Sequence, residues 1–457
     1  MDLIYLSAAA LSQQIRSKKV SSLEAVKACQ ARIAKVNPQL NAVVQLCSER
    51  ALGEAKEADA LLAKGKPKGP LHGVPMTIKD SFDTAGVVST GGTLGRKDYL
   101  PAKDATAVAR VRAAGAILLG KTNTPEFTLS FVTTNLIYGP SKNPYNLNRQ
   151  PSGSSGGAAA IIAAGGSYFD IGSDSGGSIR VPSHACGIAG IKPTAGCVPR
   201  TGHIVDYGGF TDSYQQVGPM ARRVEDLALI LPILAGPDYV DAAIAPVPLG
   251  DPSKVDLKSL RVAWYTSVAD LEPTSQIQRM VQDCAGMMKE AGARVEEARP
   301  PLLREAGEIR RKLGGADGGA RLRRMAARAG TKQTSPTLVW GDDQQLPSPQ
   351  FTDLIEKLDD CRSRMLQFLE NFEVVLCPAS RAAAPLLEAP ADSLLQLYLA
   401  LQPDGLAGGG GACRNLARGP AVGHPDRRPP LERAPGAGGG GPHRIQDRRL
   451  AAAAALG

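Results

Sequence analysis

The chain has 457 residues, of which 43% are hydrophobic and only 4% aromatic, with 50 glycines, 34 prolines and a formal net charge of +9. A chain of this length can bury a large core and corresponds to one large domain or to two or three small ones. Many glycines and prolines at ordinary hydrophobicity are typical of a loop-rich α/β protein and argue against disorder over most of the chain.

Composition and spacing also exclude several classes of protein. No apolar run is long enough to cross a bilayer, since the best candidate, residues 227–235, is short and contains Pro232. The N-terminus lacks the basic region and apolar core of a secretory signal, so we expect a cytoplasmic protein. The eight cysteines form no C-x-x-C pair and the five histidines show no metal-ligand spacing, so we expect neither a disulfide framework nor a metal site.

The positive charge is not concentrated in a stripe that would bind nucleic acid. Eight arginines against four acidic residues after position 400 supply part of the excess. We therefore expect no nucleic-acid partner.

Capping and periodicity predict helices and strands in alternation. Ser21 and Glu24 form a capping box that begins a helix reaching about Val36, and a second helix is expected over residues 51–64. Further elements are expected as a strand at 74–78, a helix at 106–114, a strand at 116–119, a helix at 157–164, a buried element at 227–234, a strand at 260–264, a helix at 276–291, and strands at 293–297 and 372–376. This alternation indicates an α/β fold.

The first of three segments able to carry chemistry is GVPMTIKD, residues 73–80, in which Lys79 ends an apolar, strand-like run. A lysine at such a position is expected to be partly buried, and burial lowers its pKa because it disfavours the ammonium form. A neutral lysine is a usable general base. The alternative is a solvated charge at a strand end.

The second segment, residues 153–157 (GSSGG), surrounds Ser154 and Ser155 with glycines that permit unusual backbone conformations and the close approach of a substrate. One alternative is a flexible turn. Another is the G-x-S-x-G nucleophile elbow with Ser155 as nucleophile, which requires an acid and a histidine later in the chain. His184 and His203 are the histidines available for it before residue 400, and neither stands in an evident acid–histidine pairing.

The third segment, residues 172–180 (GSDSGGSIR), places small residues directly before Ser178, so several backbone N–H groups are unshielded. Donors aimed at one point form an oxyanion hole, and Ser178 would attack a carbonyl carbon held there. Asp174 and Arg180 could pair and fix this loop. The alternative is an anion-binding glycine loop at a helix start, although no G-K-[ST] lysine follows.

Together these segments resemble the amidase signature family. The resemblance is carried by PSGSSGGAAAIIAAGG (151–166), FDIGSDSGGSIRVPSHACGIAGIKPTAG (169–196), GVPMTIKD (73–80) and GKTNTPEF (120–127). It runs from about residue 5 to Gly236, and more loosely to about Pro378. It implies one large α/β domain over residues 1–380, in which helices flank a central mixed β-sheet, with a catalytic core at about 70–220 and a variable substrate-pocket region at about 237–346.

The resemblance also implies roles for individual residues. Lys79 matches the family's base, Ser154 its bridging serine at a cis peptide bond, and Ser178 its acylated nucleophile. In this relay neutral Lys79 takes the proton of Ser154 while Ser154 takes that of Ser178. The backbone amides matching the oxyanion hole are those of Ser175, Gly176, Gly177 and Ser178, and the supporting residues are Ser155, Asp174 and Arg180. No metal and no organic cofactor is implied.

Within the family, the sequence favours a stand-alone amidase that hydrolyses a small-molecule amide to a carboxylate and ammonia or an amine. One branch instead supplies ammonia from glutamine within a tRNA-dependent amidotransferase, and typically carries a run of the type F-A-S-S-L-D-Q-I-G-P after the signature. Residues 206–219 depart from that run, so the glutaminase-type subunit is the alternative. We expect no membrane partner, and the sequence leaves a homodimer open.

Residues 381–457 form an anomalous tail, rich in glycine, proline and arginine and without helical or strand periodicity. One interpretation is disorder. Another is an out-of-frame translation that begins between about Pro378 and Gln396, because codons read one nucleotide later can give C-N-L-T-G-W-P-A and then G-L-P-L-G-I-Q-I-V, as at the end of similar amidases. An inactive or misfolded chain is therefore a further alternative.

Overall fold

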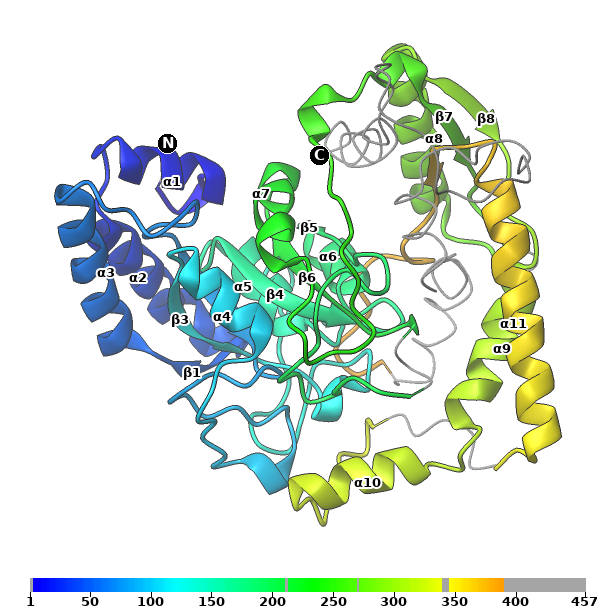
Figure 1. The fold of residues 1–457 in the computed structure, drawn as a ribbon, viewed down its shortest axis with the longest axis horizontal. Helices are drawn as coiled ribbons and strands as arrows, with labels where there is room; N and C mark the ends of the chain where they lie inside the picture. The colour runs from blue at the N-terminus through cyan, green and yellow to red at the C-terminus, as the bar shows by residue number, and fades with distance from the viewer. Residues whose placement is uncertain (1–2, 210–212, 269–270, 339–344, 390–457) are drawn as a thin grey trace, which may run out of the picture.

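The computed structural model describes residues 3–209, 213–268, 271–338 and 345–389 (Figure 1). The α/β class expected from the sequence is confirmed, with helices packed around small sheets. Most of the expected anomalous tail, residues 390–457, lies outside the described residues. Within the described ranges, no helix has both the length and the apolar composition needed to span a bilayer.

Three helices open the chain: α1 (Ala8–Arg16), α2 (Ser22–Leu40) and α3 (Ser48–Ala63). The predicted capping box is confirmed, since Ser21 Oγ accepts from the Glu24 amide at 3.1 Å and Glu24 Oε2 accepts from the Ser21 amide at 2.7 Å. Helix α2 continues past its predicted end, through Pro38, and stops at Asn41, whose φ of 48° is left-handed. The sequence does not predict α1.

The first sheet has the order β1-β3-β2 and consists of β1 (Val43–Leu46), β3 (Ile117–Thr122) and β2 (Pro75–Lys79). Strand β2 is parallel to β3, and β1 is antiparallel to β3. The parallel pair requires a crossover connection, which contains α4 (Thr106–Ala113). Every residue of β2 and β3 is buried. Burial on both faces explains the apolar run that predicts β2, and it makes Lys79, the last residue of β2, a buried lysine.

The second sheet is antiparallel, with the order β4-β6-β5, and consists of β4 (Phe169–Asp174), β6 (Gln216–Ala221) and β5 (Ala189–Gly190). The helices beside it are α5 (Gly156–Ala163), α6 (Arg180–Cys186) and α7 (Val224–Leu234) (Figure 1). Strand β4 leads directly into the loop that carries Ser178. The position of this loop is therefore set by the sheet.

A buried carboxylate joins the first two sheets. Asp170 on β4 accepts a hydrogen bond from the Lys79 amide on β2 at 3.0 Å. Its other oxygen accepts from the Thr77 hydroxyl at 2.7 Å and from the Thr122 hydroxyl at 3.0 Å. Because these partners lie on β2 and β3, Asp170 holds β4 beside β2. Lys79 at the end of β2 and Asp174 at the end of β4 consequently lie at the same junction.

The third sheet lies on the other side of the molecule from α1, α2 and α3 (Figure 1). It is parallel, with the order β8-β7-β9, and its strands are β8 (Arg294–Glu297), β7 (Arg261–Trp264) and β9 (Val374–Leu376). The helices that follow β7 in the chain are α8 (Ser275–Glu290), α9 (Leu303–Gly315), α10 (Ala320–Ala329) and α11 (Ser348–Phe368), of which the sequence predicts only α8. Short 3₁₀ helices occur at Leu3–Tyr5, Leu94–Arg96, Glu126–Thr128, Pro252–Lys254 and Leu257–Ser259. The strands expected in one central sheet are thus divided among three hydrogen-bonded sheets.

Helix α5 packs closely against the backbone of neighbouring segments, because its first residues are glycine and alanine. A Cβ atom added at Gly157 would lie 2.5 Å from the backbone nitrogen of Asn123 and 2.7 Å from the carbonyl oxygen of Ala42. These are backbone atoms, which cannot move aside as the end of a side chain can. The helix is accordingly buried from Gly156 to Ile162.

We expect Gly157→Ala to lower the free energy of unfolding by about 1–3 kcal/mol, because the added methyl overpacks a backbone contact. Gly53, an exposed glycine within α3 with nothing within 4 Å of its added Cβ, is the matched control. Gly53→Ala should raise the free energy of unfolding by about 0.5–1 kcal/mol, since alanine favours a helix interior. Urea denaturation measures both, and equal effects at the two positions would contradict the close packing of α5.

Candidate active site

The centre of the candidate site is the ammonium or amine group of Lys79. The Lys79 side chain is fully buried, with an exposed fraction of 0%, so it is not the solvated charge that the sequence leaves as an alternative. Its Nζ lies 2.6 Å from Ser154 Oγ, 2.9 Å from Ser155 Oγ and 3.0 Å from Ser173 Oγ. The structure thus brings the end of β2, the 153–157 turn and β4 together at one nitrogen atom.

Burial changes the acid–base chemistry of this lysine. Desolvation lowers the pKa of Lys79 to about 7, although the nearby carboxylates of Asp174 and Asp170 oppose the change. Burial likewise raises the pKa of Asp170 to about 6, against the hydrogen bonds that it accepts from Thr77 and Thr122. A large fraction of Lys79 is therefore neutral near pH 7, and a neutral amine can accept a proton.

The turn that carries Ser154 has the backbone that the resemblance implies, because the Gly153–Ser154 peptide bond is cis. Ser154 Oγ is buried against Lys79. The amide of Ser155 donates to the carbonyl oxygen of Ser178 at 3.1 Å, which fixes the turn to the nucleophile loop. Ser155 Oγ accepts from Lys79 and donates to the carbonyl oxygen of Ser173 at 3.5 Å.

A single carboxylate organises the loop before and after Ser178. Asp174 accepts from the Gly177 amide at 2.7 Å and from the Ile179 amide at 3.0 Å. The predicted pairing with Arg180 is confirmed, since Nε and Nη2 of Arg180 lie 2.9 and 2.8 Å from the two Asp174 oxygens. Burial alone would raise the pKa of Asp174, but the Arg180 charge and these hydrogen bonds hold it below its ordinary value. Asp174 is therefore an ionised anchor for the loop.

This anchor changes the expected oxyanion hole at one position. The Gly177 amide is directed to Asp174 and so is not available to a substrate. The φ of 127° at Gly177 is a conformation that glycine adopts without strain. The amides of Ser175, Gly176 and Ser178 donate to no acceptor in the part of the chain that the structure describes. Ser178 has an exposed fraction of 8%, whereas Ser154 is fully buried.

The geometry does not assemble the alternative nucleophile elbow at Ser155. That site would need a histidine at the Ser155 hydroxyl. His184 instead lies 3.0 Å from the carbonyl oxygen of Ala382, and His203 lies 2.9 Å from Ser173 Oγ. The sequence alone gives His203 no role in the relay, whereas the structure places it one hydroxyl away from Lys79.

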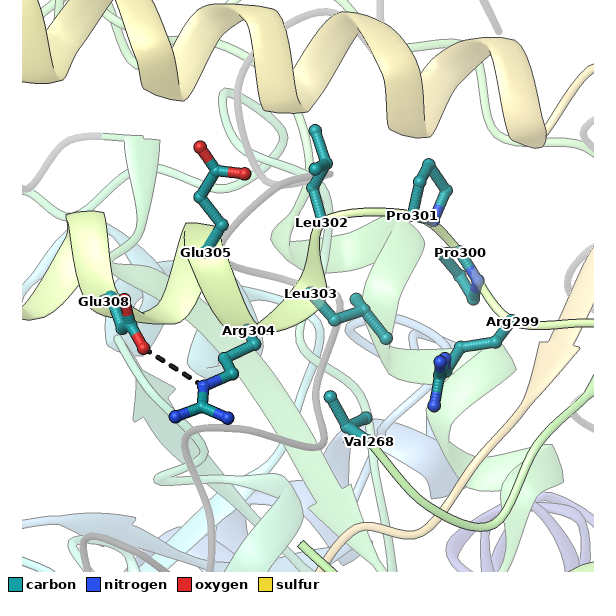
Figure 2. Close-up of a pocket in the computed structure, with 9 residues that line it drawn as sticks. All are labelled: Val268, Arg299, Pro300, Pro301, Leu302, Leu303, Arg304, Glu305 and Glu308. Atoms are coloured by element: carbon teal, nitrogen blue, oxygen red, sulfur yellow. Dashed lines mark hydrogen bonds and ion pairs between the residues drawn. The ribbon is translucent and has the colours of Figure 1, made fainter. Parts of the chain in front are cut away.

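One cavity lies away from this site and another lies beside it. Figure 2 shows a pocket of about 580 Å³ at the start of α9, lined by Val268, Arg299, Pro300, Pro301, Leu302, Leu303, Arg304, Glu305 and Glu308. None of the expected catalytic residues lines it. A second cavity of about 400 Å³ includes His203 in its lining, with Asp83, Arg96 and Phe127 among the others. Of these two cavities, the second borders the hydrogen bonds around Lys79, because its lining residue His203 lies against Ser173, which in turn contacts Lys79.

The described residues contain no evident metal centre. Among them, no group of three or more His, Cys, Asp or Glu side chains is arranged to hold a metal ion.

Residues 381–389, which the sequence assigns to the tail, contact the site region. The backbone N–H of Gln150 donates to the carbonyl oxygen of Pro385 at 2.9 Å, and the backbone N–H of Leu387 donates to the carbonyl oxygen of Asn148 at 2.8 Å. The first part of the tail therefore packs beside the turn that carries Ser154.

We expect Asp174→Asn to lower the free energy of unfolding by about 3 kcal/mol or more, because it removes a buried charge that pairs with the Arg180 guanidinium, only 19% exposed, and that accepts from two loop amides. The control is Asp353→Asn on α11, which removes an exposed pair with Lys357 at 2.8 Å and should change stability by less than about 0.5 kcal/mol. Urea denaturation measures both variants. A loss at Asp174 no greater than that at Asp353 would show that the carboxylate does not anchor the loop.

Comparison with known proteins places this geometry in a family. The family model described as Amidase matches residues 24–404. Relatives include glutamyl-tRNA(Gln) amidotransferase subunits from Carboxydothermus hydrogenoformans, 39% identical over 304 residues, and from Moorella thermoacetica, 41% identical over 306 residues. Each alignment covers 66% of this chain and 62% of the relative, so the chain spans about six tenths of the length of these relatives.

Solved structures agree with the sequence comparison. Fatty acid amide hydrolase matches with a TM-score of 0.79 at 27% identity, covering 89% of this chain and 72% of that one. A peptide amidase in complex with the competitive inhibitor chymostatin matches with a TM-score of 0.76 at 26% identity, covering 88% and 89%. The chain therefore belongs to the Amidase family, the amidase signature enzymes that its serine and lysine motifs resemble.

Proposed function

We propose that this chain hydrolyses a carboxylic amide to a carboxylate and ammonia or an amine, through an acyl-enzyme on Ser178. The observation that carries the proposal is the buried contact of 2.6 Å between Lys79 Nζ and Ser154 Oγ. A lysine that burial makes partly neutral is in position to take a proton from this hydroxyl. Because the Ser155 amide holds the Ser178 carbonyl at 3.1 Å, the turn bearing Ser154 also lies beside the nucleophile loop.

In the acylation half, Lys79 takes the proton of Ser154 as Ser154 takes that of Ser178. The freed Ser178 Oγ forms a bond with the amide carbon, and the carbonyl oxygen becomes an oxyanion. The amides of Ser175, Gly176 and Ser178 are the donors that can stabilise this charge. Breakage of the carbon–nitrogen bond leaves the acyl group on Ser178, and the nitrogen departs with a proton returned through Ser154.

In the deacylation half, water replaces the amine. Lys79 and Ser154 take a proton from the water as its oxygen attacks the acyl carbon. The bond to Ser178 Oγ then breaks, the serine regains its proton through Ser154, and the carboxylate leaves. The hydroxyls of Ser154 and Ser178, both described in the structure, are not hydrogen-bonded to each other there. Contacts of this kind in enzymes without substrate are often long and shorten when substrate binds.

The first test is covalent labelling of the full-length chain by a fluorophosphonate, with the modified residue identified by mass spectrometry. We expect the label on Ser178. The labelling rate should rise with pH through an apparent pKa of about 7, the pKa of Lys79, because the base works only when deprotonated. At pH 5, about two units below that pKa, the rate should be about 100-fold lower than at pH 9.

Three variants serve as controls. Ser178→Ala should remove the label, and Lys79→Met should hold the labelling rate about 100-fold or more below the wild-type plateau and make it independent of pH. Ser155→Ala, which removes the alternative nucleophile, should leave the label on Ser178. A wild-type labelling rate that does not change from pH 5 to pH 9 would contradict the role of Lys79 as the base. Absence of label from folded wild-type chain would favour the inactive chain that the altered tail suggests.

A second candidate is the supply of ammonia from glutamine, as one component of an amidotransferase. It is favoured by the relatives named as glutamyl-tRNA(Gln) amidotransferase subunits, at 39% and 41% identity, against 26–27% for the amidase structures named above. These relatives support the amidotransferase role better than the stand-alone role that residues 206–219 favour. In this form the leaving group is ammonia, and partner subunits would use it.

Ammonia release from glutamine, compared with that from butyramide, distinguishes the two candidates. We expect an amidotransferase-type enzyme to hydrolyse glutamine with a kcat/KM at least about 10-fold above that for butyramide, because binding contacts to the amino-acid end contribute one or more kcal/mol. Ser178→Ala measures the background. Hydrolysis of butyramide without measurable hydrolysis of glutamine would instead support a stand-alone amidase.

A further inference from the structure

We propose that His203 is a positioning residue that aims the Lys79 base at Ser154 by way of the Ser173 hydroxyl; this inference rests on the amide-hydrolase function proposed above. Ser173 Oγ lies 3.0 Å from Lys79 Nζ and 2.9 Å from His203 Nε2. The three side chains are buried, with exposed fractions of 1% for Ser173, 0% for Lys79 and 3% for His203. His203 is hydrogen-bonded to neither Ser154 nor Ser178, so it acts on the reaction through Ser173.

A neutral lysine has a limited capacity for hydrogen bonds. Its amine has two N–H donors and one lone pair, and three serine hydroxyls surround Lys79 Nζ. The lone pair faces Ser154 only when the other two hydroxyls accept the N–H groups. Ser155 can serve as such an acceptor, because its own proton is directed to the Ser173 carbonyl oxygen at 3.5 Å. The direction of the base therefore depends on the Ser173 hydroxyl.

His203 determines the direction of the Ser173 proton. With its ring proton on Nδ1, His203 donates to the Val205 carbonyl oxygen at 3.1 Å, and Nε2 accepts the Ser173 proton. Ser173 Oγ then accepts from Lys79, and the lysine lone pair faces Ser154. With the ring proton on Nε2, His203 accepts from the Val205 amide at 3.1 Å, and the Ser173 proton is free to occupy the lysine lone pair. The positioning role belongs to the first tautomer.

The surroundings keep the imidazole neutral, as this role requires. Burial and then the Lys79 charge lower the pKa of His203 to about 3, against the hydrogen bond to Val205. An imidazolium would carry protons on both nitrogens and could not accept from Ser173. The charged groups that face the network are Lys79, Arg200 and Arg96 around His203, and Asp170 and Asp174 around Lys79. Arg200 is paired with Asp241, and Arg96 with Asp83.

Two substitutions of His203, by side-chain amides of different length, give a matched test in the full-length chain. His203→Asn keeps a polar group near Val205 but is too short to reach Ser173, whereas His203→Gln can place its Oε1 near the position of Nε2. We expect His203→Asn to lower the plateau rate of fluorophosphonate labelling at Ser178 by about 10-fold or more. Its apparent pKa should also fall below that of wild type, since a Ser173 proton donated to the lone pair stabilises the neutral amine. His203→Gln should restore both values to near wild type.

A double-mutant cycle tests whether His203 acts through Ser173. Ser173→Ala should slow labelling, and adding His203→Asn to it should cause no further loss, because the connecting hydroxyl is already absent. His184→Asn, at a histidine bonded to the Ala382 carbonyl oxygen, controls for the loss of an imidazole and should label within about 2-fold of wild type. Circular dichroism checks that each variant is folded.

The outcomes separate the inference from the function on which it rests. Labelling of His203→Asn at the wild-type rate and with the wild-type pH profile would overturn the inference while leaving the function intact. Effects of His203→Asn and Ser173→Ala that multiply in the double variant would overturn it as well. Failure of wild-type Ser178 to react would overturn the proposed function, and the inference with it.

Discussion

The structure around the candidate site depends on one constraint, the burial of the Lys79 amino group with hydroxyls rather than carboxylates as its direct partners. A buried ammonium is costly without an ion pair, so the cavity around Nζ favours the neutral amine. Three serines must supply that cavity with polar atoms. The chain meets this requirement by bringing a strand end, a glycine-flanked turn and a second strand to one point.

That convergence explains the placement of the acidic residues. Asp170 and Asp174 both lie on β4, yet neither takes a hydrogen bond from Nζ: Asp170 accepts from the Lys79 backbone amide, and Asp174 is engaged by Arg180 and by loop amides. Each carboxylate therefore fixes backbone around the lysine. Direct contact with Nζ would hold the lysine protonated, and a protonated lysine is no base.

Much of this could be predicted from the sequence, and the failures have physical causes. The capping box at Ser21 and the strand ending at Lys79 follow local rules, and the serine motifs identify Ser154 and Ser178. The sequence does not predict β4 or β6, because β4 contains Gly172 and β6 contains Gly218 and Pro219, which weaken strand signals. The contributions of Ser173 and His203 are harder to predict for a different reason. They lie far from Lys79 in the chain, and no local pattern records which side chains meet across sheets.

The contact between residues 148–150 and 384–387 has a consequence for the order in which the enzyme is completed. Gln150 lies shortly before the turn that carries Ser154. Its backbone N–H donates to the carbonyl oxygen of Pro385, and its side-chain amide donates to the carbonyl oxygens of Leu386 and Leu387. A chain emerging from the ribosome contains the lysine and both serines long before it contains these partners. These hydrogen bonds beside the serine turn can therefore form only after Leu386 is synthesised, 236 residues after Gln150.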